Sequence, residues 1–198
     1  AGIAVASLLP LRERNLRRTP LPVWGMVVAH FGIAVALFGM SCESAFTEEK
    51  LVAVRIGEVT AVGPWQVKLD TIEPVAGPNW TALEARLLVR YGDDGRSIKM
   101  LPQSRSFWAP PQQTSESALL TRWNGQLYAV LGGEAPGNEG AGRWQLRLWW
   151  KPFAPLIWIG GLLIALGGVL ALAGRVASDL RRIVARDKIA YRRERQGR

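Results

Sequence analysis

Two long apolar segments without a formal charge constrain this chain more than any other feature. The first covers residues 21–40 and the second residues 153–173. A helix of about 20 apolar residues matches the roughly 30 Å hydrocarbon core of a bilayer, so each segment predicts a transmembrane helix. Between them lies a polar stretch long enough for one small domain. This order predicts a helix, a globular insert and a second helix, with both chain ends on the same side of a membrane.

The basic residues are concentrated at the two ends of the chain. Residues 1–20 contain four Arg and one Glu, and residues 174–198 contain nine Arg or Lys and three acidic residues. The stretch 41–150 has 11 basic and 12 acidic residues. Because basic flanks stay cytoplasmic, we predict a multi-pass protein of the bacterial inner membrane with a periplasmic insert. The net charge of +9 then reflects topology and contact with anionic lipid, and not binding of nucleic acid.

Five parts follow from this division. Residues 1–20 are predicted to be the end of a preceding helix and a basic cytoplasmic loop, 21–41 a transmembrane helix, 42–150 the periplasmic domain, 151–174 a second transmembrane helix, and 175–198 a basic cytoplasmic amphipathic tail. The apolar start of the chain is too short to span a bilayer. We therefore expect the chain to be the C-terminal part of a longer protein, although a separately encoded half fits as well.

The insert has the pattern of a β domain. Short apolar or alternating runs lie at 51–56, 65–69, 83–89, 127–131 and 144–148, and Gly, Pro, Asn and Asp separate them. Asn124-Gly125 predicts a two-residue hairpin turn. The glycine-rich stretch 132–142 is expected to be a mobile loop. The fold class predicted for the whole chain is therefore α + β, with transmembrane helices flanking a small antiparallel all-β sandwich or barrel.

Small residues recur along the first apolar segment at spacings of four and three. They are Gly25, Ala29, Gly32, Ala36 and Gly39. At 100° per residue they form one stripe, on which a second helix can approach closely. Paired glycines at 160–161 and 167–168 mark the second segment in the same way. Both helices are therefore expected to pack in a bundle.

His30 is the only histidine in the chain, and it lies within the first apolar segment. It sits ~13 Å along the predicted helix from Leu21, at 1.5 Å per residue. An ionisable ring at this depth is costly and indicates a functional site. Neutral imidazole is a common ligand of iron, copper and zinc. The insert contains no histidine and no catalytic motif, so we predict no catalytic residue there.

Two further features are assigned to the membrane interface. Cys42 is the only cysteine in the chain, so it forms no intramolecular disulfide, and we expect a small interfacial residue. Trp149-Trp150-Lys151-Pro152 joins the last predicted strand to the second helix. Trp and Lys at such a position are typical anchors at the level of the lipid headgroups.

Several motifs resemble CcmF, the large subunit of the bacterial cytochrome c heme lyase system. The segment 24–32, Trp-Gly-Met-Val-Val-Ala-His-Phe-Gly, looks like the histidine helix of that family. Similar motifs follow in the family's order: Val62-Gly63-Pro64-Trp65, Gly77-Pro78-Asn79-Trp80, Pro102-Gln103-Ser104-Arg105, Asn124 to Tyr128, and Trp149-Trp150-Lys151-Pro152-Phe153.

The resemblance implies a part in attaching heme to apocytochrome c. It implies that His30 is one axial ligand of the iron of an intramembrane heme b, with the second ligand on a helix outside this chain. It implies as partners a heme chaperone, apocytochrome c, other maturation subunits, other helices of the same protein and membrane lipid. The family's tryptophan-rich signature and periplasmic histidines are absent, so this stretch alone is not a complete lyase, and its own enzymatic role stays open.

A different class of function fits the residues as well. The chain could be a two-pass membrane anchor for a periplasmic β domain that binds a protein partner without a cofactor. His30 would then only hydrogen-bond to a neighbouring helix. Loss of bound iron on His30→Ala separates the two interpretations.

Overall fold

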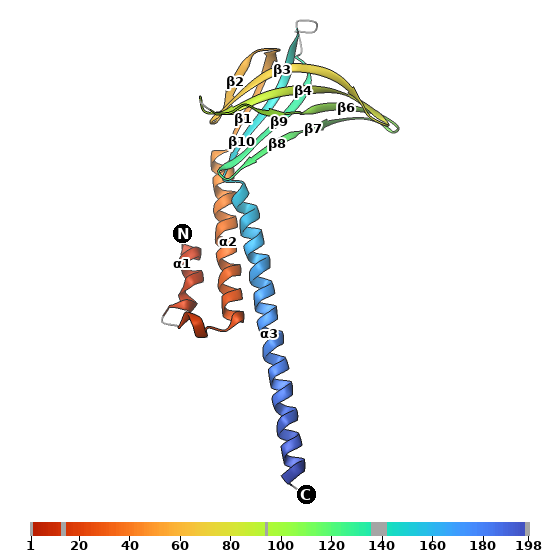
Figure 1. Cartoon of the computed structure of the whole chain (residues 1–198). Helices are drawn as coiled ribbons and strands as arrows, with labels where there is room; N and C mark the ends of the chain where they lie inside the picture. The colour runs from red at the N-terminus through yellow and green to blue at the C-terminus, as the bar shows by residue number, and fades with distance from the viewer. Residues whose placement is uncertain (1, 13–14, 94, 136–141, 197–198) are drawn as a thin grey trace. The chain divides into compact units, whose positions relative to one another are not determined.

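The computed structural model describes residues 2–12, 15–93, 95–135 and 142–196. The chain forms two compact units, which are taken in turn (Figure 1). One unit comprises residues 1–40 and 156–198, and the other comprises residues 41–155. The first unit is helical. The second contains the whole β domain.

The helical unit is dominated by two long helices, α2 (Leu21–Phe46) and α3 (Pro155–Gln196). A short helix, α1 (Gly2–Leu8), and the 3-10 turns η1 (Leu9–Leu11) and η2 (Leu16–Arg18) precede them. By length and composition, Leu21–Phe46 and Pro155–Arg186 could each cross a membrane, as the sequence predicts. The bounds differ in three ways. The first helix, α2, continues to Phe46, past its predicted end at residue 41. The last strand extends to Pro152, so α3 begins later than residue 151, and α3 continues without a break into the predicted tail.

The backbones of α2 and α3 approach each other closely at glycines (Figure 1). A Cβ on Gly25 would lie 2.5 Å from the carbonyl oxygen of Gly167, and a Cβ on Gly32 would lie 2.7 Å from that of Gly160. Only a residue without a side chain permits this approach. The contact glycines recur at every seventh position: Gly25, Gly32 and Gly39 on α2, and Gly160, Gly167 and Gly174 on α3. The predicted stripe on α2 is confirmed, whereas only the first glycine of each predicted pair on α3 faces α2.

The β domain is a sandwich of two antiparallel sheets, as predicted (Figure 1). Its strands are β1 (Glu48–Arg55), β2 (Val59–Val62), β3 (Trp65–Ala76), β4 (Trp80–Tyr91), β5 (Ile98–Met100), β6 (Gln103–Trp108), β7 (Pro111–Glu116), β8 (Ala118–Arg122), β9 (Gly125–Glu134) and β10 (Arg143–Pro152). One sheet has the order β1-β10-β9-β8. The other has the order β2-β3-β4-β6-β7, with β5 paired to β4.

The structure tests one predicted hairpin and one predicted loop of the β domain. The predicted hairpin is confirmed, because β8 pairs with β9, but its turn lies one residue earlier than predicted. Arg122 pairs with Gly125, so Trp123 and Asn124 form the turn and Gly125 begins β9. The first residues of the glycine-rich stretch, 132–134, belong to β9. Residues 136–141 of that predicted loop lie outside the described residues.

The core lies between the two sheets and follows the alternation of each strand. In β9 every second residue from Gly125 to Leu131 is buried, and β3, β4 and β10 contribute matching apolar rows. Successive side chains of a strand point to opposite faces, so one face of each sheet fills the core. The pairing of β3 with β4 shifts between Leu69 and Thr71, which marks a β-bulge. Beyond the shift, Ile72 packs against the same core as Leu69.

Adjacent glycines of α3 provide a matched test of the helix contact. A Cβ on Gly167 would lie 2.5 Å from backbone atoms of α2, whereas a Cβ on Gly168 meets nothing within 4 Å. We expect Gly167→Ala to destabilise the helix pair by about 1–3 kcal/mol, as overpacking does. Gly168→Ala should leave stability unchanged or raise it slightly, because alanine is the better helix former. Thermal unfolding in detergent measures both variants, and equal effects would contradict the proposed packing.

Two leucines on neighbouring strands test the core. Leu148 on β10 is fully buried, while Leu51 on β1 is 63% exposed. Leu148→Ala should lower the free energy of unfolding of the β domain by about 2–5 kcal/mol, because it leaves a cavity. Leu51→Ala should change it by less than about 0.5 kcal/mol. Urea unfolding followed by near-ultraviolet circular dichroism compares the two, and a loss of stability in Leu51→Ala as large as in Leu148→Ala would refute this account of the core.

Candidate functional site

His30 lies on α2, beside the face that packs against α3. Its neighbour in sequence, Ala29, belongs to that face, since the amide of Ala29 lies 2.5 Å from where a Cβ of Gly167 would be. The side chain of His30 is exposed on the helix. This position agrees with the predicted turn of about 100° away from the small-residue stripe. The imidazole is therefore open on a side of α2 that α3 does not cover.

One hydrogen bond defines which nitrogen of His30 can bind a metal. Nδ1 lies 2.7 Å from the backbone carbonyl oxygen of Met26, one turn earlier in α2. A carbonyl oxygen only accepts, so Nδ1 carries the proton and donates it. Nε2 then keeps its lone pair. Ligand histidines characteristically have this arrangement, in which a bond at one nitrogen orients the ring and leaves the other nitrogen for the metal. The residue present fits an axial heme ligand.

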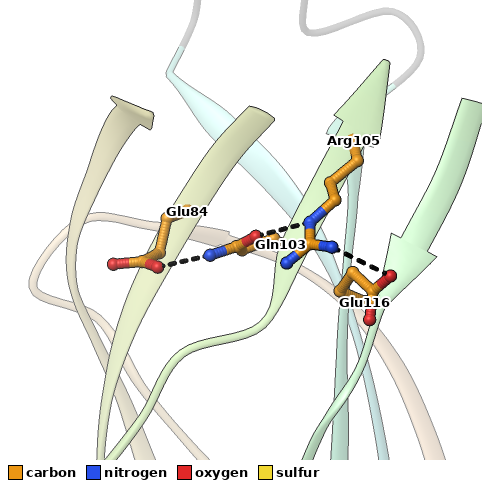
Figure 2. A network of polar contacts seen from close by, with 4 residues as sticks. All are labelled: Glu84, Gln103, Arg105 and Glu116. Carbon is orange, nitrogen blue, oxygen red and sulfur yellow. Dashed lines mark hydrogen bonds and ion pairs between the residues drawn. The ribbon is translucent and has the colours of Figure 1, made fainter. Parts of the chain in front are cut away.

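The β domain carries one conspicuous polar network on the six-stranded sheet (Figure 2). Gln103 on β6 donates from Nε2 to Glu84 on β4 at 2.6 Å and accepts from Nε of Arg105 at 2.8 Å. Arg105 also forms an ion pair of 3.2 Å with Glu116 on β7. The guanidinium of Arg105 lies 4.3 Å from the ring centroid of Trp80. The network therefore joins two of the resemblance motifs, 77–80 and 102–105.

This network stabilises strand pairing. Glu73, Glu84, Gln103 and Glu116 occupy one row across β3, β4, β6 and β7. Two arginines offset the carboxylates of this row, Arg105 as above and Arg86, which lies 3.7 Å from Glu73. Opposite charges across strands stabilise a sheet, whereas facing carboxylates alone would repel. In the described part of the chain, no group of three His, Cys, Asp or Glu residues is placed to hold a metal ion.

A cleft of about 600 Å³ opens between the two sheets. Its walls come from β3, β4, β6 and β7 on one side and from β9 and β10 on the other, and they include Leu83, Ser104 and Trp144. Histidine, cysteine and methionine are absent from its lining residues. The cleft therefore has no side chain suited to bind heme iron, and among the described residues His30 remains the candidate ligand.

The other motifs meet at the end of the β domain where the chain arrives from α2 and leaves for α3. We call this the junction end. Trp150 packs there with its ring 6.1 Å from that of Trp65. A Cβ on Gly63 would lie 2.4 Å from the Trp150 ring, and one on Gly125 would lie 2.5 Å from it. Residues of three motifs, 62–65, 124–128 and 149–153, thus form one structural cluster around a single indole.

This cluster corrects the predicted interfacial anchor at 149–152. Trp150 is only 6% exposed and belongs to the core, because strand alternation turns it inward with Leu146 and Leu148. Lys151 donates from Nζ to Glu43 at 2.8 Å. The prediction that Trp150 anchors the chain in the headgroup layer is therefore wrong. Cys42 is buried, as a small apolar residue would be.

Comparison with known proteins identifies related sequences and one related fold. The family model described as the CcmF C-terminal beta-sandwich matches residues 45–152. The cytochrome c-type biogenesis protein CycK of Bradyrhizobium diazoefficiens is 37% identical over 84% of this chain and 25% of its own length. CcmF of Escherichia coli is 32% identical over 86% of this chain and 27% of its own length.

A solved structure titled cytochrome c heme lyase CcmF superimposes with a TM-score of 0.70. It shares 21% sequence identity and covers 85% of this chain and 28% of its own, so it supports the fold alone. The chain spans about a quarter of the length of the curated relatives it matches. These matches rest on the β-sandwich together with its flanking helices, and they establish that the chain belongs to the CcmF family of cytochrome c-type biogenesis proteins.

Proposed function

We propose that this chain supplies one axial ligand, Nε2 of His30, to a heme b held within the membrane. It does so as part of a lyase that attaches heme to apocytochrome c. The heme supplies one-electron chemistry when bound, and the second ligand comes from a helix outside this chain. The hydrogen bond from Nδ1 of His30 to Met26 carries the proposal, because it leaves Nε2 as the free acceptor in an apolar helix.

The close contact of α2 and α3 supports a rigid position for this ligand. Helices held together at glycine backbones have little freedom to slide, because each contact fills the space left by a missing side chain. His30 lies between the contacts at Gly25 and Gly32 in the sequence of α2. The role proposed for this chain is therefore to orient the imidazole.

The proposal also covers the surroundings of the chain. The basic flanks support cytoplasmic ends and a periplasmic β domain in the bacterial inner membrane. A domain on that side could meet a heme chaperone, apocytochrome c or another maturation subunit. These partners, like the lyase activity of the whole assembly, are proposed from the family to which the chain belongs.

The test is the reduced-minus-oxidised absorption spectrum of native membranes that contain the chain with the rest of the lyase. His30→Ala should abolish most of the b-type signal, because the iron loses one of two axial ligands. Adding free imidazole should restore part of the signal by occupying the space left by the ring. Phe31→Ala is the matched control, since its side chain is also exposed on α2, and it should keep the signal.

Immunoblotting measures how much of each variant is in the membrane, so that a spectrum is compared at equal protein. A b-type signal of full size in His30→Ala would exclude this residue as the ligand. A signal that is lost equally in Phe31→Ala would show that disturbance of α2, and not removal of a ligand, is responsible.

A further inference from the structure

The turn between β8 and β9 presents the most exposed large apolar side chain in the described part of the protein. We call residues 122–125 the hairpin tip. Trp123 at this tip is 82% exposed, more than any other large apolar residue whose side chain the structure describes. An indole is a large apolar surface, so its contact with water is unfavourable. Single exposed apolar side chains are common, so the place of Trp123 in the fold decides what it can contact.

The hairpin tip is fixed to the segment that leads into α3. The amide of Phe153 donates to the carbonyl oxygen of Asn124 at 2.9 Å. The side-chain amide of Asn124 donates to the hydroxyl of Tyr91 at 2.8 Å. Gly125 pairs with Pro152, and a Cβ on Gly125 would lie 2.7 Å from the carbonyl oxygen of Lys151. Main-chain contacts therefore hold the tip at the level of residues 151–153.

That level adjoins the start of a helix that is long and apolar enough to cross a membrane. Phe153 stands just before Pro155, the first residue of α3 and of the segment able to span a membrane. The interfacial layer of a bilayer lies directly outside its hydrocarbon core, and Trp is enriched in that layer. The hairpin tip lies beside the start of this segment, because the carbonyl oxygen of Asn124 accepts a hydrogen bond from the amide of Phe153.

The neighbouring side chain has the matching chemistry. Arg122 is exposed, and its guanidinium lies 5.5 Å from the ring centroid of Trp65. An arginine at this height can donate to lipid phosphate while its methylene stem covers apolar surface. Lys151, which pairs with the residue next to Gly125, is engaged by Glu43. In a layer of phospholipid headgroups, an indole ring can pack among the lipids while a neighbouring arginine donates hydrogen bonds to their phosphates.

We propose that the hairpin tip is a lipid-binding element of the β domain. Trp123 inserts between the headgroups of the lipid around α3, and Arg122 lies at the level of their phosphates. The element would add a contact of the β domain with lipid beside the segment that leads into α3. It takes the interfacial role that the sequence assigned to Trp150. This proposal is independent of heme ligation by His30.

Spin labelling tests this proposal on the chain reconstituted in vesicles of phosphatidylethanolamine and phosphatidylglycerol. Cys42→Ser removes the only cysteine, and Trp123→Cys then places the label at the hairpin tip. Trp108→Cys is the matched control, because Trp108 is 56% exposed at the opposite end of the domain, where its amide donates to Asn79. Power-saturation spectra compare collisions with oxygen, which concentrates in lipid, and with a water-soluble nickel chelate.

We expect the ratio of oxygen to nickel accessibility to be several-fold higher at position 123 than at position 108. Similar ratios at the two positions would place the hairpin tip in water and overturn the proposal. Low accessibility to both reagents at position 123 would also overturn it, because protein rather than lipid would then cover the tip. Unchanged near-ultraviolet circular dichroism confirms that each labelled variant is folded.

Discussion

The structure depends on the close approach of α2 and α3 at their glycines. Two helices of this length could associate in many registers, but the seven-residue spacing of the contact glycines on each helix allows few of them. Gly25 meets Gly167 and Gly32 meets Gly160, so the chain runs up one helix and down the other with a defined pairing. Within the β domain, the first and last strands are neighbours, with Glu48 opposite Trp150.

Contacts within the β domain explain why the motifs shared with the family have the residues they do. Glycines at 63 and 125 leave room for the ring of Trp150, and Gln103 and Arg105 join three strands of the larger sheet. Most motif residues of the β domain therefore build and position the domain. The metal ligand that we propose, His30, lies in an apolar helix, and one hydrogen bond leaves its other ring nitrogen free. This proposed ligand and the motifs of the β domain belong to different units of the chain.

Sequence alone predicted the features that arise from local pattern. Hydropathy identified both long helices, the phase of Gly25, Gly32 and Gly39 identified the contact face of α2, and Asn124-Gly125 identified a hairpin. Features that depend on distant partners were not predictable. The inward orientation of Trp150 follows from its pairing in β10, and Arg105 meets Trp80 only because β6 lies beside β4. No local signal distinguished the exposed Trp123 from the buried tryptophans, since only the full topology decides which of them faces outward.

The most direct test of heme ligation by His30 is a redox titration of the b-type heme in native membranes, with His30→Met beside the unchanged protein. Methionine still binds heme iron, but replacing a histidine by methionine raises the reduction potential. The account predicts a heme that is retained and becomes easier to reduce. A midpoint potential identical in the two proteins would show that residue 30 does not ligate the iron. The chain would then have no proposed part in holding the heme.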